Sequence, residues 1–173
     1  MEQGGVVAYP TEACFGIGCD PSNQYAVRRV FRIKGRPSGM GLIVIADCID
    51  RVLPFIDTTD LSILTGPMAS WPGPYTWIFP ADARLKNYAK NPNGTIAVRV
   101  TAHPVAARLC RLLGNALVST SANRHGCKPL RTPHEVERML GNELDVVVRA
   151  PVGVQRRPTE IRDAATGRLI RAG

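Results

Sequence analysis

Short runs of apolar residues alternate along this chain with segments of helical periodicity. Residues 6–9, 42–45, 116–118 and 146–148 are apolar and rich in β-branched side chains, a pattern typical of buried strands. Residues 75–79 and 96–100 alternate in the manner of half-buried strands. Strands that alternate with helices predict an α/β fold. The succession of 75–79 and 96–100, and an expected hairpin over 160–171, indicate a mixed sheet.

The helix signals are equally local. A segment after Asp20 carries Val27, Val30 and Phe31 on one face and ends at Gly35, and residues 47–53 predict a short helix. Residues 103–113 have a proline in the first turn and Gly114 as a stop. Residues 132–135 spell a capping box, which predicts another helix with His134 facing solvent.

Length and composition exclude several classes of protein. A chain of 173 residues predicts a single domain over residues 1–173. It contains no run of about 18 apolar residues and no signal-like N-terminus, so a cytoplasmic protein with no membrane contact is expected. The five cysteines include no C-x-x-C pair and the histidines number three, which argues against a metal site. Cys14 is expected to be a half-buried thiol without a catalytic role.

The charge balance favours anionic partners without identifying them. Lysine and arginine number 22 against 14 acidic residues, for a net charge of +8. Such a surplus attracts nucleotides or RNA. A merely solvated basic surface is an equally open interpretation of the charge.

Polar side chains stand near the expected strand and helix ends, where ligands often bind in α/β sheets. Lys34 and Arg36 lie where a helix stops, and Arg99 is out of step with its apolar neighbours. Residues 119–123 form a cluster rich in hydroxyl and amide groups directly after a strand. Each feature alone is compatible with a helix end or a turn. Together they predict a site for a small anionic molecule, held without either common glycine-rich phosphate loop.

Six ordered motifs extend this prediction. They are Pro10-Thr11-Glu12 with Phe15-Gly16-Ile17-Gly18, Lys34-Gly35-Arg36-Pro37, Trp71-Pro72-Gly73-Pro74, Ala97-Val98-Arg99-Val100, Ser119-Thr120-Ser121-Ala122-Asn123, and residues 158–163 continuing to Arg171. In this order they resemble the YrdC/TsaC family of threonylcarbamoyl-AMP synthases over essentially the whole chain. The resemblance implies a YrdC-like twisted mixed β-sheet with flanking helices around a basic concave cavity.

The resemblance also implies substrates and residue roles. The reaction would join L-threonine, bicarbonate or carbon dioxide, and ATP with Mg²⁺ into threonylcarbamoyl-AMP and pyrophosphate, for delivery to a tRNA threonylcarbamoyl transferase complex that modifies the adenosine beside the anticodon. Lys34 and Arg36 would be the catalytic residues, neutralising charge on the phosphates. The ATP side would comprise Lys34, Arg36, Thr95, Ser121, Asn123 and Arg171, and the threonine side Thr11, Arg99, Ser119 and Thr159.

Some positions depart from the family pattern. Relatives usually carry a helix before the Gly4-Gly5 pair, and many have Lys or Asn where this chain has Met40. Thr159 replaces a more common serine, and His125, expected to be solvent-exposed, also stands where serine is usual. Glu12 is a further candidate, for orienting the amine or a metal-bound water.

Two rival functions stay open. The first is an RNA-binding module that uses the basic concave surface for tRNA or ribosomal RNA, although no RNA-binding motif is present. The second is a carbamoyl-transfer enzyme acting on another amine, since related domains occur in hydrogenase maturation proteins; those carry zinc-finger cysteines that this chain lacks.

Overall fold

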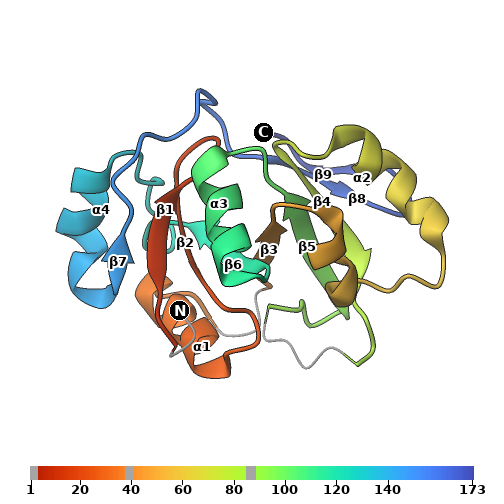
Figure 1. Cartoon of the computed structure of the whole chain (residues 1–173), viewed down its shortest axis with the longest axis horizontal. Helices are drawn as coiled ribbons and strands as arrows, with labels where there is room; N and C mark the ends of the chain where they lie inside the picture. Colours follow the sequence, from red (N-terminus) through yellow and green to blue (C-terminus); the bar gives the residue numbers. More distant parts are fainter. Residues whose placement is uncertain (1–3, 38–40, 85–88) are drawn as a thin grey trace.

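The computed structural model describes residues 4–37, 41–84 and 89–173, so the prediction for Met40 falls outside the described residues. Within these ranges one sheet of nine strands runs through the molecule in the order β7-β1-β2-β6-β3-β5-β4-β8-β9 (Figure 1). The strands are β1 (Val7–Pro10), β2 (Phe15–Cys19), β3 (Ile43–Ala46), β4 (Tyr75–Pro80), β5 (Thr95–Val100), β6 (Leu117–Ser121), β7 (Val146–Val147), β8 (Glu160–Asp163) and β9 (Leu169–Arg171).

Helices and 3₁₀ turns connect these strands. The α-helices are α1 (Gln24–Lys34), α2 (Thr65–Ser70), α3 (Pro104–Leu113) and α4 (Pro133–Leu140). The 3₁₀ turns are η1 (Ile49–Arg51), η2 (Leu53–Phe55), η3 (Leu61–Leu64) and η4 (Gly141–Glu143). None of the helices in the described ranges has the length and apolar character needed to cross a bilayer.

The sheet is mixed, as predicted. Strand β3 pairs parallel with β5 and antiparallel with β6, and β4 pairs antiparallel with β5 and parallel with β8. The expected terminal hairpin is the antiparallel pair β8 and β9 at one edge. This mixed α/β architecture confirms the predicted fold class.

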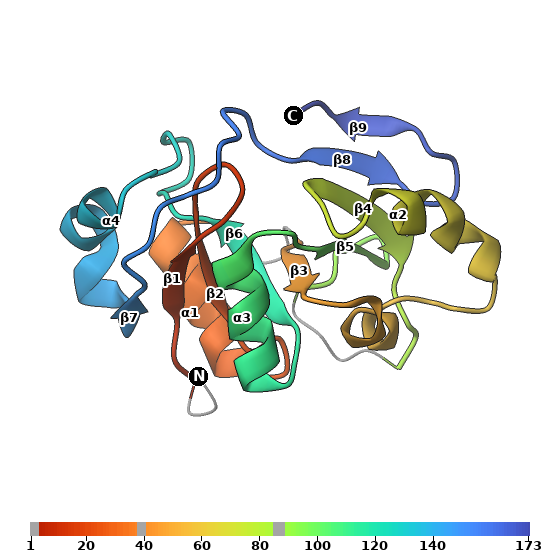
Figure 2. The same cartoon turned by 45° about the horizontal axis from the view of Figure 1, so that its top comes forward.

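Helices α1 and α3 cover opposite faces of the central strands, as Figure 2 shows. Val6 and Ala8 pack in the cluster that contains the buried residues of α1, whereas Val7 and Tyr9 pack with Ala106 of α3. Because successive side chains of a strand point to opposite faces, β1 contributes to both cores at once. Burial on both faces explains why its sequence is continuously apolar.

Helix α3 covers only part of its face of the sheet. Ile45 and Leu117 are paired across β3 and β6 and are buried beneath α3. The next pair on that face, two residues along each strand, is Ile43 with Ser119, and both residues line a cavity. The change from leucine to serine along β6 therefore marks where the helix-covered core ends and an open, polar surface begins.

The local helix signals are confirmed. Asn23 caps α1 by accepting a hydrogen bond from the Ala26 amide, and Gly35 ends that helix with φ of 59°. Both hydrogen bonds of the Thr132–Glu135 capping box are present. The exposed His134 also agrees with the prediction.

Other predictions needed correction. Strand β2 was not predicted from the sequence. It contains two glycines, and glycine is rare in strands. The short helix α2 was not predicted, and the helix expected over residues 47–53 is replaced by the two 3₁₀ turns η1 and η2. Strand β6 continues to Ser121, so part of the polar cluster belongs to the strand and does not follow it.

The close approach of β2 and β6 makes Gly18 a sensitive position. A Cβ atom there would lie 2.2 Å from the Val118 carbonyl oxygen and 3.0 Å from the Tyr9 ring, so strand backbone would have to move. We expect Gly18→Ala to lower the free energy of unfolding by about 1–3 kcal/mol. Gly141→Ala is the matched control: its φ is −53° and its nearest neighbour would be 3.9 Å away. Urea titration of both variants measures the difference, and equal stabilities would contradict the packing described.

Candidate functional site

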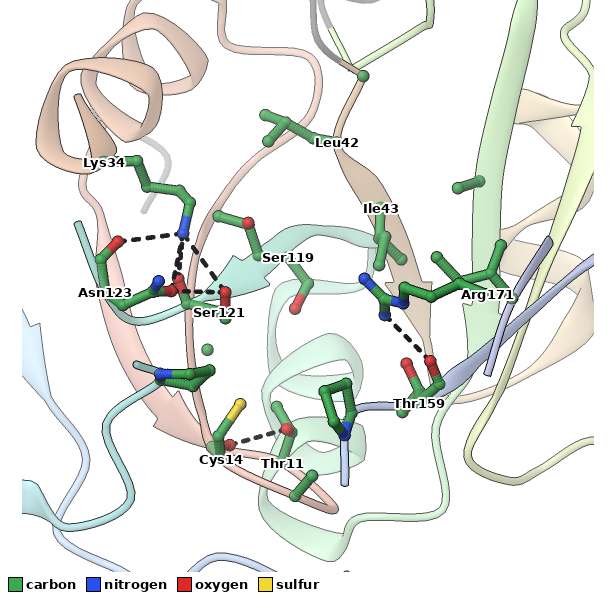
Figure 3. Close-up of a pocket in the computed structure, with 18 of the residues that line it drawn as sticks. Thr11, Cys14, Lys34, Leu42, Ile43, Ser119, Ser121, Asn123, Thr159 and Arg171 are labelled. Atoms are coloured by element: carbon green, nitrogen blue, oxygen red, sulfur yellow. Dashed lines mark hydrogen bonds between the residues drawn. The ribbon is translucent and has the colours of Figure 1, made fainter. Parts of the chain in front are cut away.

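A cavity of about 490 Å³ opens on the face of the sheet beside α3 (Figure 3). Its walls include residues of every strand from β2 to β9 except β7, of the loops after β1 and β6, of the segment before β8 and of the end of α1. Nine of the ten predicted site residues line it. They are Thr11, Lys34, Arg36, Arg99, Ser119, Ser121, Asn123, Thr159 and Arg171.

Thr95 is the predicted residue that the cavity does not include. Its hydroxyl donates to Asn93 Oδ1 at 2.8 Å and accepts from Asn91 Nδ2 at 3.0 Å. Asn91 does line the cavity. Thr95 thus stands one residue removed from the cavity wall, and its proposed contact with ATP stays a prediction.

Lys34 connects α1 to the loop that follows β6. Its ammonium donates to the Ser121 carbonyl at 2.6 Å, and to the carbonyl and Oδ1 of Asn123 at 3.1 Å each. Figure 3 shows these bonds converging on the lysine nitrogen. Burial, and then the nearby Arg36, lower the Lys34 pKa to about 8. Lys34 is therefore both a support for the Ser121–Asn123 segment and a positive charge at the cavity wall.

The side chain of Asn123 fixes the loop further. Its Oδ1 accepts from the Ser121 hydroxyl at 2.6 Å, and its Nδ2 donates to the carbonyl oxygens of Arg124 and Cys127. All of these partners lie within residues 121–127. The polar cluster detected in the sequence is thus a preorganised loop whose orientation is set before any ligand arrives.

Arg99 is a buried cation on β5, with 4% of its surface exposed. Its side chain shares the cavity face with Ala97 and Ile43, which explains why it breaks the apolar pattern. Its Nη2 lies 3.5 Å from Glu12 Oε2. Glu12 itself does not line the cavity, so the structure places no part of that carboxylate where it would meet an amine or a metal-bound water in the cavity.

Arg171 and Thr159 form a second group across the cavity from Lys34 (Figure 3). Arg171 Nη2 donates to the Thr159 carbonyl at 3.0 Å. Burial, and then the charge of Arg99, lower the Arg171 pKa. Arg171 was predicted on the ATP side and Thr159 on the threonine side, so their contact places Arg171 where the two sets of residues meet.

A glycine keeps space open between two hydroxyl-bearing side chains of the cavity. The Thr11 hydroxyl donates to the Cys14 carbonyl at 2.8 Å. A Cβ atom at Gly16 would lie 3.3 Å from both Ser119 Oγ and Thr11 Cγ2, so the glycine leaves room between these two hydroxyl-bearing side chains. The glycines of the motif Phe15-Gly16-Ile17-Gly18 are therefore explained by close packing against neighbouring groups and not by a turn.

Neutral residues complete the lining. Cys14 lines the cavity and is half-buried, as expected, and burial raises the pKa of its thiol. His125 is exposed, as predicted, but also lines the cavity rim. Asn91 was missed by sequence reasoning, since it lies in a turn between strands without a distinguishing motif. Among the described residues no cluster of His, Cys, Asp or Glu could hold a metal ion.

Comparison with known proteins identifies the family of this chain. The sequence profile of the Sua5/YciO/YrdC family, described as telomere recombination, matches residues 1–173. The chain belongs to this family.

Two curated relatives extend the match over their full lengths. The chain is 47% identical to the threonylcarbamoyl-AMP synthase of Thiobacillus denitrificans, over 99% of this chain and 91% of the relative. It is 46% identical to the threonylcarbamoyl-AMP synthase of Vibrio vulnificus, over 100% of this chain and 94% of the relative. The family resemblance predicted from ordered motifs is thereby confirmed.

A solved member of the family shares the fold. The crystal structure of P. abyssi Sua5 complexed with L-threonine superposes with a TM-score of 0.89 at 24% identity and covers 98% of this chain. The present chain spans about half of that protein, since the match covers 50% of its length. At 24% identity, the similarity to this structure shows that the two proteins share a fold.

The state of Lys34 generates a test on anion binding. Because its pKa is about 8, the ammonium loses its proton as pH rises through that value, and attraction for an anion falls with it. We expect the affinity for AMP, whose phosphate is already ionised above about pH 7, to drop between pH 7.5 and 9 by up to about tenfold per pH unit, the limit for one linked proton. Isothermal titration calorimetry measures this drop.

Lys34→Met is the matched control for that titration. It removes the titrating group, so its affinity for AMP should be weak at pH 7.5 and flat to pH 9. A wild-type affinity that does not change with pH, in protein that remains folded, would contradict a role for the Lys34 charge in anion binding.

Proposed function

We propose that this chain catalyses the formation of threonylcarbamoyl-AMP and pyrophosphate from L-threonine, bicarbonate or carbon dioxide, and ATP. One observation carries the proposal. A single cavity contains the buried guanidinium of Arg99 beside threonine and serine hydroxyls, and the basic side chains of Lys34 and Arg36. The chain is also 46–47% identical to threonylcarbamoyl-AMP synthases.

The threonine end would be built around Arg99. A planar guanidinium pairs bidentately with a carboxylate, which makes Arg99 suited to the carboxylate of the amino acid. The hydroxyls of Thr11, Ser119 and Thr159 supply polar partners for the substrate hydroxyl and amine. Because these three residues are at least nine-tenths buried, an analogue without the hydroxyl would leave one of them unpaired, and threonine would be preferred. The P. abyssi Sua5 crystallised with L-threonine supports this substrate.

The ATP end would be built around Lys34, Arg36 and the Ser121–Asn123 loop. Burial lowers the pKa of Arg36, but a guanidinium stays charged at neutral pH. Its Nε has no hydrogen-bond partner within the described ranges, so this cation retains a donor for phosphate oxygens. Neutral hydrogen-bond donors of the loop would hold the remaining phosphate oxygens.

The chemical step needs positioning rather than a protein nucleophile. The threonine amine and carbon dioxide form a carbamate. A carbamate oxygen then bonds to the α-phosphorus of ATP while the bond to the leaving pyrophosphate breaks. Lys34, Arg36 and Arg171 would stabilise negative charge that develops on the phosphates, and the enclosing walls would hold the carbamate against the phosphorus. Cys14 takes no part, because its raised pKa keeps it protonated.

Mg²⁺ fits this proposal as a component of the substrate Mg-ATP. The cavity-lining residues of the described chain include no aspartate or glutamate, the protein groups that most often bind this ion. The ion would neutralise phosphate charge while the cations of the chain orient the nucleotide.

The product implies a partner. Threonylcarbamoyl-AMP is a mixed anhydride that water would destroy, so it requires prompt transfer to an acceptor. A tRNA threonylcarbamoyl transferase complex is the acceptor that this proposal assigns. Direct contact with tRNA is not required for synthesis of the adenylate.

A pyrophosphate assay tests the proposed reaction. With Mg-ATP and bicarbonate, the purified protein should release pyrophosphate in the presence of L-threonine and yield an adenylate of the mass of threonylcarbamoyl-AMP. Valine and alanine should support at most about a hundredth of the rate, since they lack the hydroxyl that the buried polar groups would pair with. Arg99→Lys should raise the KM for threonine by roughly tenfold or more, because a point charge cannot replace the planar fork.

Arg108→Lys provides the control for that substitution, since Arg108 is an arginine of α3 outside the cavity lining. It should leave the KM for threonine unchanged. Folded wild-type protein that binds RNA but forms no adenylate would contradict the proposal and favour the RNA-binding alternative. Adenylate formation with an amine other than threonine would instead favour the carbamoyl-transfer alternative.

A further inference from the structure

A buried carboxylate lies behind the arginine fork of the cavity. Glu12 is 7% exposed and follows Thr11, a residue of the cavity wall, in sequence. The cavity lining includes Arg99 but not Glu12. The carboxylate therefore contacts the guanidinium without itself forming part of the cavity wall.

Glu12 is held rigidly in this position. Its Oε1 accepts a hydrogen bond from the Thr101 hydroxyl at 2.6 Å, and that hydroxyl accepts in turn from the His103 amide at 3.1 Å. The Glu12 carbonyl accepts from the Gln155 amide at 3.2 Å. Gly153 packs so closely that a Cβ there would lie 2.6 Å from the Glu12 carbonyl oxygen. Side chain and backbone of Glu12 are thus both fixed by segments outside the cavity.

The contact between Glu12 and Arg99 is electrostatic and does not use up the fork. Glu12 Oε2 and Arg99 Nη2 are 3.5 Å apart, longer than the roughly 2.7–2.9 Å of a charge-assisted hydrogen bond. Neither Glu12 Oε2 nor Arg99 Nε has a hydrogen-bond partner in the described parts of the chain. A pair whose purpose was only mutual neutralisation would be expected to close into a bidentate contact, which leaves fewer donors for a ligand.

The ionisation of Glu12 is consistent with this arrangement. Burial alone would raise the pKa of the carboxyl, but the charge of Arg99 and the Thr101 hydroxyl outweigh it, so the Glu12 pKa is lowered. His103, whose own pKa is lowered by burial, is the third titratable group of this cluster. Glu12 is therefore an anion at neutral pH.

We propose that Glu12 is a positioning residue, which holds the Arg99 guanidinium from behind so that its remaining donors face the cavity and pair with the carboxylate of the amino-acid substrate. The inference rests on the proposed function, in which Arg99 binds that carboxylate. A guanidinium on a flexible stem must otherwise be ordered by the ligand itself, at a cost in affinity. Glu12 would order the Arg99 guanidinium before the substrate arrives.

Glu12→Gln tests the proposal, because it keeps the shape and an acceptor for Thr101 but removes the charge. We expect the KM for L-threonine to rise by roughly tenfold, as for a misplaced binding group, while the KM for ATP stays within about twofold of wild type. The discrimination between L-threonine and L-threoninamide, which lacks the carboxylate, should shrink by a similar factor. Glu12→Asp keeps the charge and should recover part of the affinity for threonine.

Asp47→Asn is the matched control. Asp47 is another buried carboxylate, which pairs with Arg51 and Arg111 away from the cavity. The Asp47→Asn substitution should lower thermal stability without changing the KM for threonine or the KM for ATP. If Glu12→Gln also lowers stability alone and leaves the KM for threonine unchanged, Glu12 is only structural and the proposal is wrong.

The outcomes separate the two proposals. Wild-type protein that forms no adenylate rejects the proposed function and this inference with it, whereas active wild type with an unchanged KM in Glu12→Gln rejects the inference alone. If Glu12→Gln does not fold at the assay temperature, Glu12→Asp serves instead: a raised KM for threonine with an unchanged KM for ATP supports positioning, and wild-type values contradict it.

Discussion

Four positive side chains gathered at one cavity, two of them buried and none paired with a carboxylate in the cavity wall, are the constraint on which this structure depends. Lys34, Arg36, Arg99 and Arg171 line one cavity whose described walls contain no acidic side chain. Their mutual repulsion and loss of water must be offset by dipoles and by charges placed behind the walls. The carbonyl groups around Lys34 and the carboxylate of Glu12 supply that compensation. The cavity is therefore electrostatically suited to an anionic ligand.

The sheet provides the rigidity that such an arrangement requires. Arg99 and Ser119 belong to strands, and each lies on the face that α3 leaves open. Lys34 sits at the last turn of a helix whose other face is packed in the core. The polar groups are therefore held by elements whose positions are fixed by burial of apolar neighbours, and a ligand would meet a site that needs little rearrangement.

Much of this could be predicted from the sequence because the signals were local. The capping box at Thr132, the glycine stop at Gly35 and the misfit of Arg99 in an apolar strand each depend on a few adjacent residues. Strand β2 escaped prediction because Gly16 and Gly18 serve close packing against Tyr9, Thr11 and Ser119, which only the fold brings together. The position of Glu12 behind Arg99 depends on contacts 87 and 89 residues away in sequence, for which no local pattern exists. Thr95 shows the reverse case, a residue assigned by resemblance that the cavity lining does not include.

A crystal structure of the protein with L-threonine and a non-hydrolysable ATP analogue would show whether one cavity holds threonine and nucleotide side by side. We expect the threonine carboxylate on the fork of Arg99, the threonine hydroxyl among Thr11, Ser119 and Thr159, and the phosphates against Arg36 and the Ser121–Asn123 loop. The amine should then point toward the α-phosphate with space for one carbon dioxide between them. Threonine bound elsewhere, or phosphates that lie outside this cavity, would rule out a shared site for the two substrates.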